Sequence, residues 1–443
     1  MDSGLLHDVV AAALRAGADA AEAVGAERSS LSVTVRLGEL EEVEREEARD
    51  LSLRVFIGTQ QAVVSGSDLS ATARAKLVER AVAMARLAPE DPYCGLAPED
   101  RLAKGPGPAL DLYDDTELSP ESLERQAHEA EAAARGVEGV SNTDGGSASW
   151  TSAAWRHVTS AGFDGAHQAS AFAISASAIA GEGAEMERGG EGRHTRHLED
   201  LPGATSIGLE AGKRAVDRLG ARKIESRTAP VIFENRLATS IIGPFVGAVS
   251  GPAVARGVSF LKDKLGQRVF GDHIDIIDEP HRVRGLGSTP FDDEGVVTSD
   301  LSLIEKGVLT TWLLNTSAAK QLGMQTTGHA SRGGASPPGT GPHNLTLVPG
   351  RRSLADLMGD AKEGLLVTSM FGPSLNNNTG DWSAGVSGFW FEDGELAYPV
   401  TEITVAGNLI DIYARLIPAS DLELRGANNA PSLLVDGLAI AGR

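Results

Sequence analysis

LNNNTGDWSAGVSGFWFEDGELAYPVTEITVAGNLI, residues 375–410, has the pattern that indicates how the C-terminal half of this chain folds. Short runs of alternating apolar and polar residues follow one another there, separated by turn residues such as those of Asn376–Gly380. A period of two with frequent turns is typical of antiparallel strands. From Thr228 onwards the pattern is one helix followed by a long series of such strands. We therefore predict a mainly antiparallel β domain, of barrel or sandwich type, over residues 225–443.

The start of the chain predicts a first unit of helices and strands. Apolar residues between Leu5 and Leu14 recur at helical spacing and indicate an opening helix. A second helix is expected to begin after a capping residue at Asp68 or Ser70. We assign residues 1–105 to an N-terminal α+β domain. Its expected strands lie between the two helices, at 31–36, 51–57 and 61–64.

A second α+β unit is expected over residues 106–224. The Pro- and Gly-rich segment 88–118 is typical of a linker. Ser119-Pro120-Glu121 then supplies a capping hydroxyl, a proline at the first helical position and a carboxylate at the positive end of the helix dipole. The elements expected after this helix start are strands at 150–159 and 168–178, a mobile loop at 181–193 and a helix at 204–219.

Charge and cysteine content exclude several functions. The 443 residues include 40 basic and 61 acidic side chains, a net charge of −21, and no basic patch is visible. Such a chain repels phosphate backbones and anionic lipid, so we expect neither nucleic acid nor membrane as a partner. The single cysteine, Cys94, excludes an intrachain disulfide and any multi-cysteine metal site. Because no basic-apolar start and no run of ~20 apolar residues is present, we expect a cytoplasmic location.

A search for catalytic motifs returns no complete set. His128-Glu129 is not followed by a second histidine at metalloprotease spacing. His194 and His197, with Glu199 and Asp200 behind them, could bind a metal, but their expected loop context favours a solvated polar segment. The spacing of a further group favours strand ends and turns: His273, Asp275, Asp278 and His281. From the residues alone we expect no catalytic or metal-binding residue in this chain.

Several blocks of sequence resemble the TldD/PmbA family, and within it the TldE (PmbA)-like subunits. Their order and spacing extend the resemblance over essentially the whole chain. The blocks are VTVRLGELEEVE (33–44), SGSDLS (65–70), APVIFENRLATSIIGPFVGAVSG (229–251), the segment from Arg256-Gly257 to Gly266, GLGSTPFDDEG (285–295), residues 375–410 and DLELRG (421–426).

The resemblance implies a cytosolic, zinc-dependent peptidase built as a TldD–TldE heterodimer. In that pair the TldD-like subunit carries the zinc on an HExxxH helix, and the TldE-like subunit closes a shared chamber for unfolded or precursor peptides bound as an added strand. No cofactor is then expected in this chain, and zinc is expected in the TldD-like partner. When the Arg256-Gly257 segments are aligned, the HExxxH positions fall near Ile242, Gly243 and Gly247, none of which can bind zinc.

The leading hypothesis is therefore a non-catalytic subunit of a heterodimeric metallopeptidase, a hydrolase complex. Asn376, Asn377, Asn378 and Thr379 are the candidate contacts with peptide or partner, since Asn pairs with a backbone through donor and acceptor; a plain turn is the alternative. A second hypothesis is a homodimeric peptide-binding or regulatory protein without protease activity. A third is an independent hydrolase that uses His194 and His197.

Overall fold

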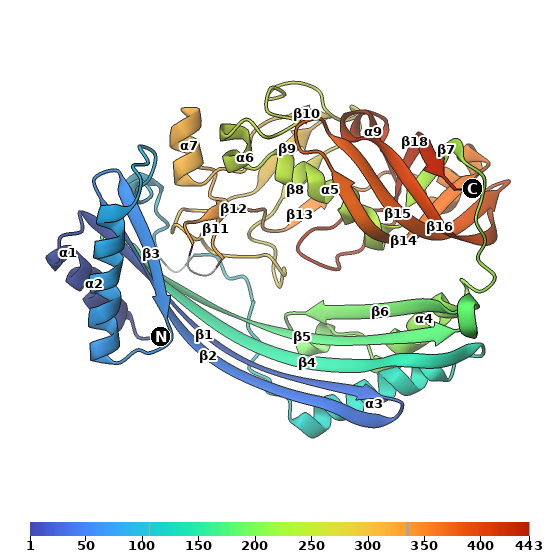
Figure 1. The fold of residues 1–443 in the computed structure, drawn as a ribbon, viewed down its shortest axis with the longest axis horizontal. Helices are drawn as coiled ribbons and strands as arrows, with labels where there is room; N and C mark the ends of the chain where they lie inside the picture. The colour runs from blue at the N-terminus through green and yellow to red at the C-terminus, as the bar shows by residue number, and fades with distance from the viewer. Residues whose placement is uncertain (106, 334–335, 443) are drawn as a thin grey trace.

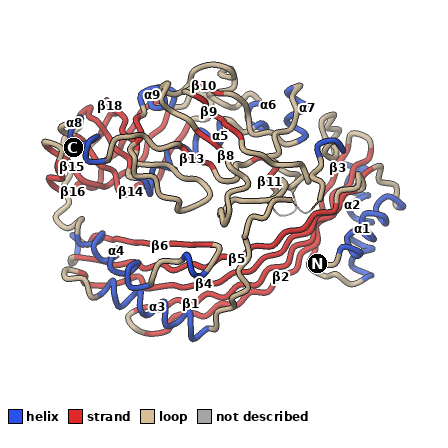
Figure 2. The backbone as a smooth tube through the Cα atoms, turned by 180° about the vertical axis from the view of Figure 1, so that it is seen from behind, coloured by secondary structure: helices blue, strands red, loops and turns tan. Residues whose placement is uncertain are grey.

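A long curved sheet and a second, β-rich body face each other in this protein (Figure 1). The computed structural model describes residues 1–105, 107–333 and 336–442. The N-terminus lies beside the sheet, whereas the C-terminus lies in the opposite body, as the view from behind also shows (Figure 2). The observed class is α+β, with a C-terminal barrel-like sheet, as the sequence predicted.

The curved sheet has six antiparallel strands in the order β3-β2-β1-β4-β5-β6. Its concave side faces the C-terminal body (Figure 1). The strands of both predicted N-terminal units take part in it, and the domain boundary near residue 105 stays a prediction. The strands are β1 (Ala20–Arg36), β2 (Glu39–Ile57), β3 (Gln60–Gly66), β4 (Val140–Thr159), β5 (Asp164–Ala180) and β6 (Glu187–Thr195).

The prediction of a mobile loop at 181–193 was wrong, because β6 occupies most of that range. β6 pairs with β5 from Glu187 to Thr195. Its glycines suggested a loop, but Gly189 is needed for close packing, since a Cβ there would lie 2.2 Å from the backbone nitrogen of Ala215 in the helix α4 (Ala204–Val216). Glycine in a strand often marks such a close approach of two backbones.

Two helix pairs cover the sheet and form two hydrophobic clusters with it. The helices α1 (Ser3–Arg15) and α2 (Ala71–Leu87) pack on β1–β3. The helices α3 (Pro120–Arg135) and α4 pack on the other end, where α3 lies beneath the convex side (Figure 1). Side chains of Ser70 and Ser119 cap α2 and α3, in agreement with the predicted helix starts.

The C-terminal body is built around a closed ring of strands. The order is β16-β15-β14-β7-β18, and β16 also pairs with β18, so the sheet has no break in this ring. Only the β7–β14 pair in the ring is parallel. β17 (Ile417–Pro418) extends it beyond β18. The ring strands are β7 (Arg227–Phe233), β14 (Gly364–Leu375), β15 (Asp381–Glu392), β16 (Glu395–Asn408) and β18 (Leu433–Ala441).

The largest hydrophobic cluster lies between this ring and the helix α5 (Asn235–Ala248). Phe245 of α5 and Phe270 pack against Tyr413, whose hydroxyl donates a hydrogen bond of 3.0 Å to the Ile241 carbonyl. The remaining elements line the side of this body that faces the sheet or its outer surface. They are α6 (Gly251–Ala255), β8 (Ile276–Asp278), β9 (Leu301–Glu305), β10 (Val308–Leu309), α7 (Thr316–Leu322), β11 (Ala330–Ser331), β12 (Gly339–Thr340), β13 (Leu345–Leu347), α8 (Leu354–Ala361) and α9 (Leu409–Arg415). Three short 3₁₀ turns belong instead to the N-terminal part of the chain: η1 (Glu99–Arg101), η2 (Gly183–Glu185) and η3 (Leu198–Asp200).

Candidate functional site

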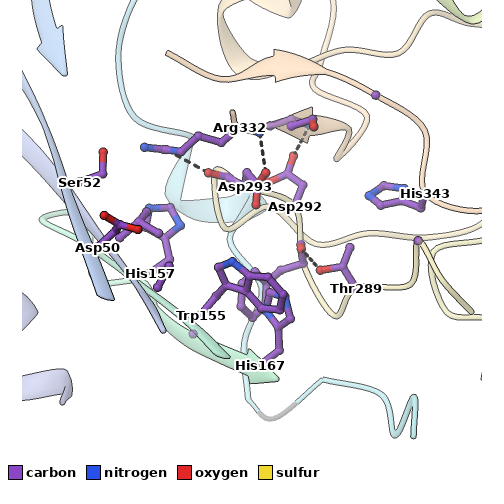
Figure 3. Close-up of a pocket in the computed structure, with 18 of the residues that line it drawn as sticks. Asp50, Ser52, Trp155, His157, His167, Thr289, Asp292, Asp293, Arg332 and His343 are labelled. Carbon is purple, nitrogen blue, oxygen red and sulfur yellow. Dashed lines mark hydrogen bonds between the residues drawn. The ribbon is translucent and has the colours of Figure 1, made fainter. Parts of the chain in front are cut away.

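A cavity of about 630 Å³ lies where the curved sheet meets the C-terminal body. Strands β1 to β5 supply one wall, and the loops 287–293, 330–332 and 341–343 supply the other. Figure 3 shows Arg332, Asp292 and Asp293 on one side, with Trp155 and His167 across from them. Both halves of the chain must therefore be in place for this cavity to exist.

One side of the cavity is aromatic. The rings of Trp155 and His167 stack with centroids 5.0 Å apart, and His167 and Phe163 each meet Phe291 edge to face. Burial lowers the pKa of His167 and so favours the neutral form of its ring. Such a surface is suited to apolar side chains and the flat faces of peptide groups.

A buried charge cluster underlies the same cavity. Glu22 is 1% exposed and accepts bonds from Arg54 at 3.1 Å, His157 at 3.0 Å and Arg332 at 2.6 Å. Burial alone would raise the pKa of this carboxyl, but these three groups, with Arg332 foremost, hold it well below its usual value. Two arginines and a histidine thus surround one carboxylate.

Arg332 has hydrogen-bond donors to spare. Its Nη2 serves Glu22 and the Asp293 carbonyl, which lies 3.1 Å away. Its Nε and Nη1 are buried, in a side chain that is only 7% exposed, and they find no partner among the residues that the structure describes. Because a buried unpaired donor costs about 1–3 kcal/mol, these two groups would gain a partner if a shift of the Arg332 side chain brought them to a ligand oxygen in the cavity.

Asp292 and Glu294 organise the loop that carries Phe291. Asp292 accepts backbone N–H groups from Glu294, Val296 and Ala330 at 2.9–3.0 Å, and Glu294 accepts that of Thr316 at 2.8 Å. Burial and then the neighbouring Glu294 raise the pKa of Asp292, while the three N–H groups oppose this rise. These carboxyls act as fixed supports that shape the cavity wall.

A second group, Asp278, His329 and His343, lies against the cavity. Asp278 Oδ2 is 3.0 Å from His329 Nε2 and 2.7 Å from His343 Nδ1, and all three residues are buried. Burial alone would raise the pKa of Asp278, but hydrogen bonds from the two histidines lower it to about 2. One ligand atom from each residue lies within 4.8 Å of the others, which is the spacing of a metal-binding group. His343 also lines the cavity.

The sequence grouped Asp278 with His273, Asp275 and His281, and the structure gives it other partners. The structure separates it from His273, which bonds the Leu416 carbonyl, and from His281, which bonds Thr298. Asp275 accepts the backbone N–H of Lys306 instead. The true companions lie 51 and 65 positions away and are brought in by the pairing of β8 with β13 and by the turn before β11. No local spacing could have shown this.

His194 and His197 do not come together as a site. His194 lies on β6, whereas His197 precedes the turn η3 and bonds the Asp111 carbonyl at 3.0 Å. Glu199 and Asp200 each accept a hydrogen bond from the Arg284 side chain. Among the described residues, only Asp278, His329 and His343 form a group spaced to hold a metal ion.

Helix α5 carries the positions at which the resemblance locates the partner's zinc ligands. Ile242 is 3% exposed and belongs to the core, as the apolar stripe of this helix predicted. Gly243 and Gly247 are exposed, and nothing lies within 4 Å of where their Cβ atoms would be. The helix continues through Pro244. Its side chains offer no donor atom at these three positions, so they do not fit a zinc ion.

The turn Asn376–Thr379 divides into two kinds of residue. Asn376 accepts the backbone N–H of Asn378, and Thr379 donates to Asp381, so both side chains hold the turn. All four residues are exposed. Asn377 and Asn378 offer their side-chain amides to the solvent, and a role in contact with peptide or partner stays a prediction.

Comparison with known proteins identifies the class of this one. Family models for PmbA/TldA metallopeptidases match the chain in three parts: domain 1 over residues 21–85, the central domain over 113–219 and the C-terminal domain over 226–442. Metalloprotease PmbA of Escherichia coli O157:H7 is 35% identical over 99% of this chain and 96% of its own length. The chain therefore belongs to the PmbA/TldA metallopeptidase family.

Solved structures agree with this fold. A protein from Bacteroides thetaiotaomicron, described as a candidate modulator of DNA gyrase, matches with a TM-score of 0.92 at 27% identity and covers 99% of this chain and 98% of its own. TldE from Thermococcus kodakarensis matches with a TM-score of 0.86 at 21% identity, over 99% of this chain and all of its own, and shows the shared fold. None of the described helices is long and apolar enough to span a bilayer.

Proposed function

We propose that this chain is a TldE-like subunit of a heterodimeric zinc metallopeptidase in the cytoplasm, in which a TldD-like partner holds the catalytic zinc. The observation that carries the proposal is helix α5. A metallopeptidase of this family needs a metal, yet the three α5 positions aligned with HExxxH are a buried isoleucine and two exposed glycines. The catalytic metal would polarise the scissile carbonyl or activate a water. This chain would supply binding surface around it.

The cavity supports peptide as the ligand. Its aromatic wall of Trp155, His167 and Phe291 accommodates apolar side chains, and a shift of the Arg332 side chain can present its unpaired Nε and Nη1 to peptide carbonyls. A second cavity of about 510 Å³ lies between the sheet and the C-terminal body, next to Arg236 and Arg425. Two cavities on the same side of the sheet would serve an extended, unfolded segment better than a compact ligand.

Addition of the peptide as a strand beside β6 is not favoured. The carbonyls of Arg188 and Gly190 accept hydrogen bonds from Arg218 and Arg214 at 2.9 and 3.3 Å, so side chains of α4 and of the segment just after it already occupy acceptors along this edge. We therefore place the peptide in the cavity, between the sheet and the loops 287–293 and 330–332. The net charge of −21 gives no support to contact with nucleic acid.

The deciding experiment measures hydrolysis of an unfolded peptide by this chain alone, by a TldD-like subunit alone and by the two together. We expect turnover from the pair, with at least a tenfold loss when either chain is omitted. Turnover by the isolated chain would overturn the non-catalytic role. Peptide binding by a stable homodimer, with no turnover after addition of the partner, would favour a regulatory peptide-binding protein instead.

A further inference from the structure

One buried group of potential ligands takes no part in the function proposed above, namely Asp278, His329 and His343. They come from three separate segments, namely the end of β8 and the residues just before β11 and β13. Their exposed fractions are 0%, 1% and 7%. Buried charges in proteins are paired or coordinate metals, because an isolated buried carboxylate is very costly. The partners of Asp278 therefore decide what this group is for.

No permanent cation neutralises Asp278. Within the described part of the chain, its ion-pair partners are only the two histidines, and neither a lysine nor an arginine reaches it. Its Oδ1 accepts the backbone N–H of His343 at 2.8 Å, and its Oδ2 faces both imidazole rings. A positive charge at Oδ2 must come from a proton on a ring or from a bound cation.

The tautomer of His329 is set by its surroundings. Its Nδ1 lies 2.8 Å from the Thr327 carbonyl, an atom that can only accept a hydrogen bond. When Nδ1 donates to this carbonyl, rather than accepting from the Thr327 hydroxyl at 3.0 Å, Nε2 of a neutral ring is a bare lone pair. That lone pair faces the Asp278 carboxylate at 3.0 Å. Two acceptors at this distance need either a second ring proton, as in the hydrogen bond described above, or a metal ion between them.

This arrangement is the one that metal-ligating histidines adopt. Such a histidine donates its second ring N–H to a backbone carbonyl or carboxylate, which fixes the ring and exposes the other nitrogen to the metal. Two imidazoles and one carboxylate form a common three-ligand set for zinc sites that keep a further position open. His343 borders the 630 Å³ cavity, so an open position on that side would meet the bound ligand.

We propose that Asp278 Oδ2, His329 Nε2 and His343 Nδ1 bind a divalent transition metal of the zinc class, with a remaining coordination position toward the cavity. The site uses residues outside α5, and it goes beyond the subunit role proposed above. Its presence requires no partner chain. The metal joins three segments of the C-terminal body, so it should also stabilise the loops that form one cavity wall.

The test is metal binding by the isolated, chelator-stripped full-length chain, with no peptide present. Titration with Zn²⁺ by calorimetry and with Co²⁺ by visible absorption should give one tight site, and saturating Zn²⁺ should raise the melting temperature. Asp278→Asn and His343→Gln should each weaken binding by more than about tenfold, since even outer-shell changes cost roughly 10–100-fold. His281→Gln, which changes a nearby histidine bonded to Thr298, is the matched control and should keep the affinity.

The location of the ion can be found without any substitution. Anomalous scattering from a cobalt-soaked crystal should place the metal between the three ligand atoms, and this result stands even if a buried variant fails to fold. The proposal is wrong if the unaltered chain binds neither ion, or if the ion lies elsewhere. Since the readout is binding by this chain alone, such a failure leaves the peptidase experiment unaffected. Metal-dependent turnover by the isolated chain would support the site and overturn the non-catalytic role.

Discussion

Arg332 Nη2 donates a hydrogen bond of 2.6 Å to Glu22 Oε1, and this bond joins residues 310 positions apart in the chain. Glu22 lies on β1 of the curved sheet, and Arg332 follows β11 in the C-terminal body. The pair is therefore a direct link between the two walls of the cavity. Both side chains are more than nine-tenths buried, so the link is protected from solvent screening.

Replacement of Glu22 by glutamine should destabilise the protein most at neutral pH. The folded pKa of Glu22 lies well below its usual value, so its contribution is present above the pKa of the unfolded carboxyl and is lost as pH falls through the folded pKa. Breaking a buried ionic cluster costs about 3–5 kcal/mol. Urea unfolding of Glu22→Gln and the unaltered chain, from pH 7 down to pH 3, should show a difference that narrows with acidification.

A surface carboxylate supplies the control for this experiment. Glu41 lies on β2 of the same sheet, is 49% exposed and is 3.9 Å from Arg36. Exposed pairs contribute little, so Glu41→Gln should change the free energy of unfolding by less than about 1 kcal/mol. A difference between Glu22→Gln and the unaltered chain that stays constant with pH would contradict the role assigned to the ionised carboxyl.

Replacement of Arg332 by methionine should affect both the contact between the walls and the binding of peptide. The methionine keeps apolar volume but removes the bond to Glu22 and the two spare donors. In a double-mutant cycle with Glu22→Gln, the two losses of stability should fall short of additivity by about 0.5–3 kcal/mol, because the residues share one interaction. Strict additivity in urea unfolding would mean that the two side chains do not interact in solution.

Peptide affinity separates the two roles of Arg332. Glu22→Gln keeps Nε and Nη1 of Arg332 beside the cavity, so peptide binding measured by fluorescence anisotropy should weaken more in Arg332→Met than in Glu22→Gln. Equal affinities in the two variants would assign Arg332 to structure alone.

Two glycines in helices should respond in opposite ways to the same substitution. A Cβ on Gly208 of α4 would lie 2.0 Å from the Ala130 carbonyl of α3, whereas one on Gly247 of α5 meets nothing within 4 Å. Gly208→Ala should therefore cost about 1–3 kcal/mol through overpacking. Gly247→Ala should gain up to about 1 kcal/mol, because alanine loses less backbone entropy in a helix. Thermal unfolding of both variants gives the sign of each change in stability. An unchanged stability of Gly208→Ala would show that α3 and α4 can move apart.

The sequence predicted elements whose signals are local. Ser70 and Ser119 cap helices where they were expected, and the alternation in residues 375–410 forms strands β15 and β16. Strand β6 was missed because glycines in a short stretch of sequence indicate a loop. In the structure, Gly189 is required instead by the close approach of helix α4.

The candidate site could not be predicted because it depends on contacts between distant segments. Asp278 meets His329 and His343 only after β8 and β13 have paired, and Glu22 meets Arg332 only after the two bodies have closed on each other. Residue type offers one weak signal, since a histidine between two small residues, as His329 is between Gly328 and Ala330, has to find a polar partner once buried.

The turn at Asn376–Thr379 offers a test of contact against mere turn formation. The side chain of Asn376 accepts the Asn378 N–H, and Asn408 donates to the Thr379 carbonyl at 2.9 Å, so this framework holds without the amides of Asn377 and Asn378. The double variant Asn377→Ala/Asn378→Ala should then unfold within about 0.5 kcal/mol of the unaltered chain. If these amides contact peptide or the TldD-like partner, the variant should weaken the corresponding affinity several-fold in calorimetry. Asn376→Ala is the matched change that should lower stability instead. Unaltered affinity for both ligands in the double variant would leave this segment as a turn and nothing more.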